Sequence, residues 1–210
     1  MITPASHAPF DASPPSRPFV TIPAMRLLLA LTLALAAPLT FATSPMGPVR
    51  YGHATGSTLG FSSSYDGESF DGRFAQFTTD IAFDPASAAG RFDVVIQLAS
   101  AGTENDERDE TLLGAEFFNA TAMPQARYQA TAFRKLADGR FVADGTLTLR
   151  GITKPVPLTF RWTPGATPKL EGTATVKRLE FGIGTGDWDD TEVMPDAVRV
   201  TTTLVLQPKP

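Results

Sequence analysis

The chain of 210 residues contains no cysteine. This absence excludes disulfide bonds, thiolate metal sites and cysteine nucleophiles. Histidine is almost as scarce, with two residues in the chain, and the 22 acidic residues outnumber the 18 basic ones. A net negative charge without a basic cluster argues against binding to nucleic acid. The composition therefore favours neither thiol chemistry nor a nucleic-acid partner.

Long hydrophobic runs are also rare. Met25-Arg26 precedes the apolar run LLLALTLALAA, and small residues follow as far as Ala42. This layout is typical of a secretory signal, whereas a membrane span needs a longer run. We predict an N-terminal extension and signal peptide over residues 1–42, cleaved after Ala42, and one periplasmic domain over residues 43–210. We expect translation to begin at Met25; a retained N-terminal anchor is the alternative.

From Val49 onward, short segments of alternating apolar and polar residues are separated by Gly, Pro, Asn and Asp. Such alternation predicts strands. The apolar parity changes between Phe74 and Phe77, which predicts a bulge near Ala75-Gln76. About eight antiparallel strands with a single helix bury their apolar faces most simply as a closed barrel. The predicted fold is therefore an all-β, antiparallel eight-stranded barrel with one short helix.

Only the segment TENDERDETLLGAEFF, residues 103–118, has the features of a helix, with acidic residues early and apolar residues late. Its carboxylates lack the order of a calcium-binding loop. We therefore expect a solvated connection here and no metal site.

The segment from Asp144 to Trp162, DGTLTLRGITKPVPLTFRW, has two alternating runs joined at Gly151-Ile152-Thr153-Lys154. This pattern predicts a hairpin with one apolar face and a turn over residues 151–154. Pro155 and Pro157 lack N–H groups at alternate positions of the returning strand. We expect that strand to lie near an edge or the rim of the barrel.

Small residues occupy several predicted inward positions, and they bear on whether the barrel is hollow. They could leave room for one small ligand, or they could fit a solid core or a closely packed helix. Both interpretations remain open. The six positions are Ala130, Ala132, Ala143, Gly145, Gly172 and Ala174.

No catalytic constellation is evident. His53 is the only histidine after the predicted cleavage site, and no G-x-S-x-G serine accompanies it. The loop FGIGTGDWDD lacks the Lys-Ser/Thr ending of a P-loop, and we expect Asp189-Asp190 to be solvated. We predict no catalytic residue, no cofactor and no enzymatic activity; a hydrolase using His53 is a remote alternative.

Six pieces of the sequence together resemble the YceI-like family of exported bacterial lipid-binding proteins, which have a lipocalin-like eight-stranded barrel. The similarity spans Val49 to Leu206. In chain order, the pieces are Gly72-Arg73-Phe74 with Phe77, Phe83-Asp84-Pro85, Arg108-Asp109, Glu116-Phe117-Phe118, the run GTLTLRGITKPV from Gly145 to Val156, and Arg178 with Phe181-Gly182-Ile183-Gly184.

The resemblance implies a long isoprenoid or similar lipid held in the barrel, by a carrier or scavenger without an established reaction. From strand parity, the candidate lining residues are Phe61, Phe77, Ile81, Phe83, Phe92, Val94, Ile96, Ala130, Phe141, Leu147, Leu149, Phe160 and Trp162.

The sequence departs from many relatives, which carry a histidine in an early strand and a polar stretch after the Arg-Asp pair. Here these places read FSSSYDGESF and ETLLGAEFF. With the late GTGDW, the pattern is similar to a branch found beside membrane-bound b-type cytochromes. That branch implies a prenylated quinone as cargo, or an accessory module that docks on a cytochrome in electron transfer or a stress response. The oligomeric state stays open.

Overall fold

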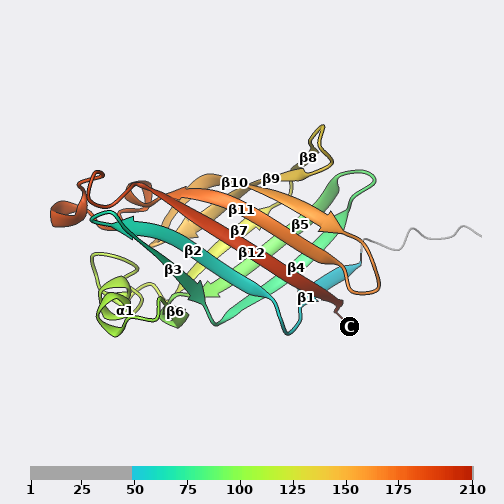
Figure 1. The fold of residues 1–210 in the computed structure, drawn as a ribbon. Coiled ribbons are helices and arrows are strands. Elements are labelled where there is room, and N and C mark those ends of the chain that lie inside the picture. The colour runs from blue at the N-terminus through green and yellow to red at the C-terminus, as the bar shows by residue number, and fades with distance from the viewer. Residues whose placement is uncertain (1–48, 210) are drawn as a thin grey trace, which may run out of the picture. The chain divides into compact units, whose positions relative to one another are not determined.

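The computed structural model describes residues 49–209, so the predicted signal peptide at residues 1–42 lies outside the described residues. Strand segments form one antiparallel sheet, which Figure 1 shows as a barrel. The segments are β1 (Arg50–His53), β2 (Thr58–Tyr65), β3 (Glu68–Phe74), β4 (Phe77–Asp84), β5 (Ala89–Gln97), β6 (Ala101–Gly102), β7 (Gln125–Ala130), β8 (Phe133–Lys135), β9 (Phe141–Leu149), β10 (Ile152–Thr163), β11 (Lys169–Lys177) and β12 (Ala197–Pro208). The helices of this region are α1 (Asp106–Leu113) and the short 3-10 helices η1 (Leu98–Ser100), η2 (Arg178–Phe181) and η3 (Gly186–Trp188).

The twelve segments make eight strands of the barrel, because in four cases two consecutive segments together form one strand. β1 and β2 both pair with β12, and β7 and β8 both pair with β9. β3 and β4 are separated only at Ala75-Gln76, where the parity change predicts a bulge, and β5 continues through η1 into β6. Pairing of β12 with β1 closes the ring. The predicted closed antiparallel eight-stranded barrel with one α-helix is confirmed.

Ser57 completes the ladder where β1 gives way to β2. Its hydroxyl donates to the carbonyl oxygen of Val205 at 3.2 Å and accepts from the Val205 N–H at 3.0 Å. The Ala54 N–H also donates to the Val205 carbonyl oxygen, at 2.7 Å. A side chain thus replaces the missing strand partner of β12, and the closing seam stays hydrogen bonded.

The β9–β10 hairpin turns more tightly than the sequence suggests. Arg150 and Gly151 have φ values of 52° and 75°, and Ile152 already pairs with Leu149. Positive φ at both central residues is the geometry of a two-residue turn that matches the strand twist. The predicted turn over residues 151–154 is therefore wrong, since residues 152–154 belong to β10.

Pro155 and Pro157 lie at a partly open seam. The β9–β10 ladder runs through both prolines, whereas pairing of β10 with β11 stops at Thr159↔Thr173. A proline cannot donate to a ladder, and this half of β10 is not paired with β11. The strand behaves as an edge on this side, as the prolines predict.

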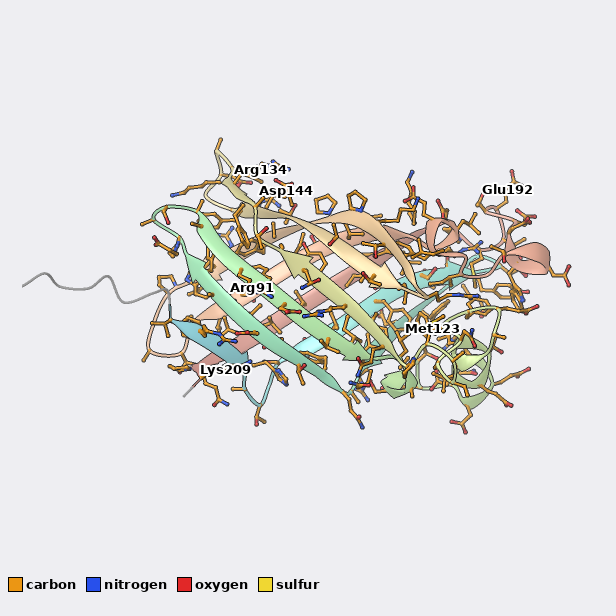
Figure 2. All side chains as sticks on the ribbon, turned by 180° about the vertical axis from the view of Figure 1, so that it is seen from behind. Arg91, Met123, Arg134, Asp144, Glu192 and Lys209 are labelled. Atoms are coloured by element: carbon orange, nitrogen blue, oxygen red, sulfur yellow. The ribbon has the colours of Figure 1, made fainter. Side chains whose placement is uncertain are left out.

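The barrel interior has two halves. In one half, aromatic side chains fill the space around Phe83; we call this half the aromatic plug. The ring centre of Phe83 lies 5.0–6.0 Å from those of Phe92, Phe133, Phe141, Phe160 and Trp162. The other half contains Phe61, Leu147 and Leu149 and extends to the loops around α1. Charged side chains such as Arg91, Arg134 and Asp144 point away from the barrel (Figure 2).

Loss of the Ser57 hydroxyl tests the closure. Ser57→Ala leaves the Val205 N–H without its partner, so we expect the free energy of unfolding to fall by about 1–2 kcal/mol. Urea unfolding measures this change. The matched control is Thr55→Ala, an exposed residue of the same turn, which should change the stability little. Equal effects of the two substitutions would contradict the role of Ser57.

Candidate functional site

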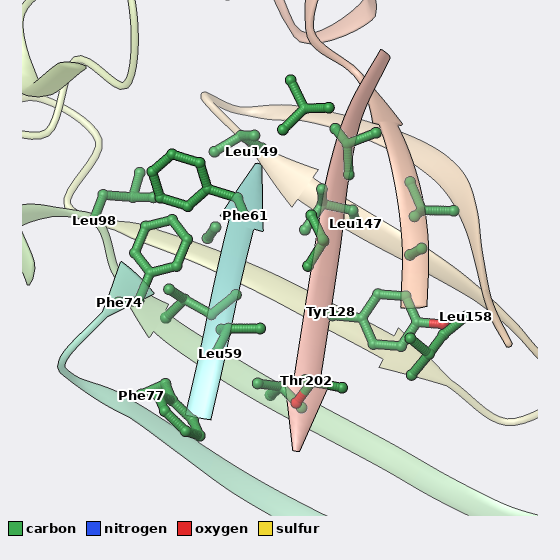
Figure 3. Close-up of a pocket in the computed structure, with 18 of the residues that line it drawn as sticks. Leu59, Phe61, Phe74, Phe77, Leu98, Tyr128, Leu147, Leu149, Leu158 and Thr202 are labelled. Atoms are coloured by element: carbon green, nitrogen blue, oxygen red, sulfur yellow. The ribbon is translucent and has the colours of Figure 1, made fainter. Parts of the chain in front are cut away.

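A cavity of about 180 Å³ lies inside the barrel, next to the aromatic plug (Figure 3). Strands from around the barrel contribute to its wall, and nearly all of the lining side chains are apolar. Figure 3 shows Phe61, Phe74 and Leu149 on one side of this space and Tyr128 and Leu158 on another. Such a surface can take up an apolar molecule through burial, without any charged contact.

The predicted lining residues face the interior but divide between its two halves. Eight line the cavity: Phe61, Phe77, Ile81, Phe92, Val94, Ile96, Leu147 and Leu149. Five belong to the packed half instead: Phe83, Ala130, Phe141, Phe160 and Trp162. Strand parity thus identifies the inward face, while contact of any of these residues with a ligand stays a prediction.

The two small inward glycines make room for neighbouring side chains. A Cβ on Gly145 would lie 2.3 Å from the hydroxyl of Tyr128, and one on Gly172 would lie 3.0 Å from Leu158. Ala132 is exposed, because the register with β9 shifts by one residue between Gln129↔Thr146 and Phe133↔Ala143. The predicted inward position of Ala132 is therefore wrong. Of the six small residues, only Ala174 lines the cavity.

One end of the cavity is covered by residues 103–124 and 178–196, which we call the cap. In Figure 1, α1 and the loop after β11 lie at the same end of the barrel, opposite β8 and the C-terminus. The cap contributes lining residues that strand parity did not identify, because loops carry no such period. They are Leu112, Phe117, Phe118, Arg178, Ile183 and Met194.

Helix α1 is fastened to Thr103, the residue that directly follows β6. Asp109 accepts hydrogen bonds from the Thr103 N–H at 2.8 Å and from its hydroxyl at 2.6 Å. Arg108 donates from Nε to the Thr103 hydroxyl at 2.8 Å, and its guanidinium lies 4.5 Å from the ring centre of Phe70. The Asn105 side chain caps the helix by accepting from the Arg108 N–H. The Arg-Asp pair of the resemblance therefore anchors the cap.

Arg178 holds the second part of the cap together from inside. Its side chain is only 2% exposed. Burial lowers the pKa of its guanidinium, and the carboxylates of Asp196 and Asp189 offset part of this effect. The guanidinium donates to backbone carbonyl oxygens throughout the loop: those of Ile183, Gly184, Trp188, Met194 and Pro195. Every donor group of this buried cation is committed to the loop.

The two parts of the cap are joined at Glu116 and Phe117. The indole N–H of Trp188 donates to the Glu116 carboxylate at 2.8 Å, and the Gly184 N–H donates to the Glu116 carbonyl oxygen at 2.7 Å. The Phe117 ring packs edge-on against Trp188, and its carbonyl oxygen accepts from Arg150 of the β9–β10 turn. The cap is thus one hydrogen-bonded assembly across the end of the barrel.

The candidate base, His53, packs against side chains of β4. His53 stacks on Phe77 with ring centres 4.5 Å apart, and its Nδ1 lies 3.5 Å from the hydroxyl of Thr79. Burial, and to a smaller extent the positive charge of Lys209, lower the pKa of His53.

Among residues 49–209, no three His, Cys, Asp or Glu side chains gather as a metal site requires. None of the helices in this range is both long and apolar enough to cross a membrane.

Comparison with known proteins agrees with this architecture. A family model described as a YceI-like domain matches residues 53–206. The chain belongs to this family. A UPF0312 protein from Yersinia pestis is 36% identical over 135 residues, which cover 60% of this chain and 67% of that protein. A UPF0312 protein from Yersinia enterocolitica matches to the same extent.

Solved structures show the same YceI-like fold. BcnA of Burkholderia cenocepacia aligns with a TM-score of 0.65 at 31% identity, over 71% of this chain and 95% of BcnA. The YceI protein of Campylobacter jejuni aligns with a TM-score of 0.58 at 27% identity, over 66% of this chain and 84% of its own. A polyisoprenoid-binding domain from Saccharophagus degradans aligns with a TM-score of 0.59, over 77% of this chain and 99% of its own. Its 20% identity supports the shared fold alone.

Substitution of Arg178 tests the cap. Arg178→Met removes the donors from buried carbonyl oxygens, so we expect a loss of about 3 kcal/mol or more in the free energy of unfolding. Arg178→Lys keeps the charge but offers fewer donors in another geometry. Its free energy of unfolding should lie between those of the natural protein and Arg178→Met. Thermal unfolding measures the loss. Arg199→Met, an outward residue of β12, is the control; a loss for Arg178→Met no larger than this control's would contradict the assignment.

His53 predicts a pH dependence of stability. Because its folded pKa lies below the ordinary value of 6.5, the unfolded chain binds more protons as the pH falls through this region. The contribution of neutral His53 is therefore complete above about pH 7 and is lost on acidification towards pH 5. His53→Phe keeps a ring beside Phe77 but cannot titrate. The melting temperature of this variant should fall less between pH 7 and pH 5 than that of the natural protein. Equal falls would contradict the contribution of His53 to the pH dependence.

Proposed function

We propose that this protein binds a long isoprenoid or similar apolar lipid inside the barrel and acts as a carrier or scavenger. The observation that carries the proposal is the apolar cavity between the aromatic plug and the cap. The polyisoprenoid-binding domain from Saccharophagus degradans has the same fold. YceI-like domains have a binding-type fold, and we propose no enzymatic activity for this one.

Apolar burial alone can supply the affinity. Each methylene-sized unit transferred from water contributes about 0.8 kcal/mol, so several isoprene units give strong binding without charged groups. The cavity of about 180 Å³ is smaller than the roughly 300–1,000 Å³ of typical ligand pockets. We therefore expect a long chain to displace side chains of the cap or to leave one end outside the barrel.

The signal-like N-terminus and the resemblance support a proposal for the location and the cargo. We propose export to the periplasm with cleavage after Ala42, and a prenylated quinone is one lipid that fits an apolar cavity. An accessory role beside a membrane-bound b-type cytochrome is the alternative, and it requires an apolar docking surface. The large apolar residues that are most exposed are Val49, Tyr65, Met123 and Ile152. We favour the carrier role because the apolar cavity inside the barrel supports it directly.

The direct test is organic extraction and mass spectrometry of the mature protein purified from its native periplasm. We expect an isoprenoid lipid to co-purify and the protein mass to match a chain beginning at Thr43. Absence of any lipid, together with no uptake of long-chain isoprenoids by the purified protein, would overturn the proposal.

A cavity-filling substitution tests where the lipid binds. Ala174 lines the cavity. The variant Ala174→Leu places a larger side chain in space that the ligand needs. Exclusion of about two methylene-sized units should weaken binding by about 1.6 kcal/mol, roughly fifteenfold. Lipid titration followed by tryptophan fluorescence measures the affinity. Thr175→Leu, on the outward face of the same strand, is the matched control, and equal affinities of the two variants would place the lipid elsewhere.

A further inference from the structure

Polar side chains are few in the cavity wall, and almost all of them have protein partners. The Tyr128 hydroxyl donates to the carbonyl oxygen of Ala143 at 3.2 Å, and the Thr202 hydroxyl donates to that of Thr58 at 3.3 Å. Thr79 lies at hydrogen-bonding distance from His53, and Arg178 is committed to the cap. These groups hold the barrel and cap together and have little left to offer a ligand.

Ser63 is the exception. It lines the cavity, and its hydroxyl oxygen is buried without a hydrogen-bond partner among residues 49–209. Such an oxygen costs about 1–3 kcal/mol when nothing compensates it. The alternation of β2 aims Leu59, Phe61 and Ser63 at the interior, so an apolar side chain would fit the pattern.

Ser63 lies near the cap end of the cavity. It pairs with Phe70 of β3, and Phe70 is covered by the guanidinium of Arg108 from α1. The N–H of Asp66, at the end of the same hairpin, donates to the Val193 carbonyl oxygen in the second part of the cap, at 2.9 Å. A group bound to Ser63 is therefore close to the cap, with apolar wall on the side of the plug.

Resting on the proposed function, we propose that Ser63 binds the polar end of the lipid, and that this end is an uncharged hydrogen-bonding group such as a hydroxyl or a carbonyl. A hydroxyl side chain can donate to a carbonyl oxygen and can donate to or accept from an alcohol. Within residues 49–209, the wall offers no free cation for a phosphate, because Arg178 is its one cationic residue and the donors of Arg178 are used within the protein. Burial of an unpaired anion in this cavity is strongly unfavourable.

The test compares ligands that differ only in their polar end: geranylgeraniol, the matching hydrocarbon without the hydroxyl, and geranylgeranyl phosphate. We expect Ser63→Ala to weaken binding of the alcohol by about three- to tenfold and to leave the affinity for the hydrocarbon unchanged. Ser63→Thr retains a hydroxyl and should recover part of the loss. The phosphate should bind the natural protein more weakly than the alcohol does.

Controls separate this inference from the function on which it rests. Ser62→Ala, on the outward face of β2, should leave all three affinities unchanged, and Ser63→Ala should melt no lower than the natural protein. If the natural protein binds neither the alcohol nor the hydrocarbon, the proposed function fails. If both bind but Ser63→Ala affects them equally or not at all, or if the phosphate binds most tightly, only the role of Ser63 fails.

Discussion

Closure of the sheet is the constraint on which the rest of the structure depends. A ring of eight strands has a narrow interior that its own inward side chains can fill or leave partly open. Here the rings around Phe83 fill one half, and the other half keeps a cavity. The ring is closed although two of its strands are not paired along their whole length. Ser57 bonds to β12 at the break between β1 and β2, and the proline-bearing part of β10 is not paired with β11.

The pieces of sequence that mark the family mostly hold this frame together. Arg108 and Asp109 fasten α1 to Thr103, and Arg178 gathers the carbonyl oxygens of the loop after β11. Gly72 lies so close to the ring of Phe61 that a Cβ would be 2.2 Å from it. These residues determine how the cavity is covered and shaped. A family resemblance based on them therefore predicts the barrel and its cap better than it predicts the ligand.

Alternation along the chain was enough to predict most of the strands, their inward faces and the break at Ala75-Gln76, but not β1, whose residues lack a clear alternation. It could not predict how far the cavity extends, because the plug depends on rings from β4, β5, β9 and β10 meeting in space. The Arg150-Gly151 turn was missed because an arginine with positive φ has no clear sequence signal. Ala132 was misplaced because one extra residue between β7 and β8 reverses the facing of the side chains that follow.

An apolar cavity gives affinity more readily than selectivity. Every methylene of a ligand gains about the same free energy wherever it lies in such a space, so chain length and shape decide binding. A single unpaired hydroxyl changes this balance, because a ligand that satisfies Ser63 removes a cost that a pure hydrocarbon leaves in place. The hydrogen bond is weak beside the total apolar burial, but it acts at one position. It can therefore orient a chain that the rest of the wall would accept in either direction.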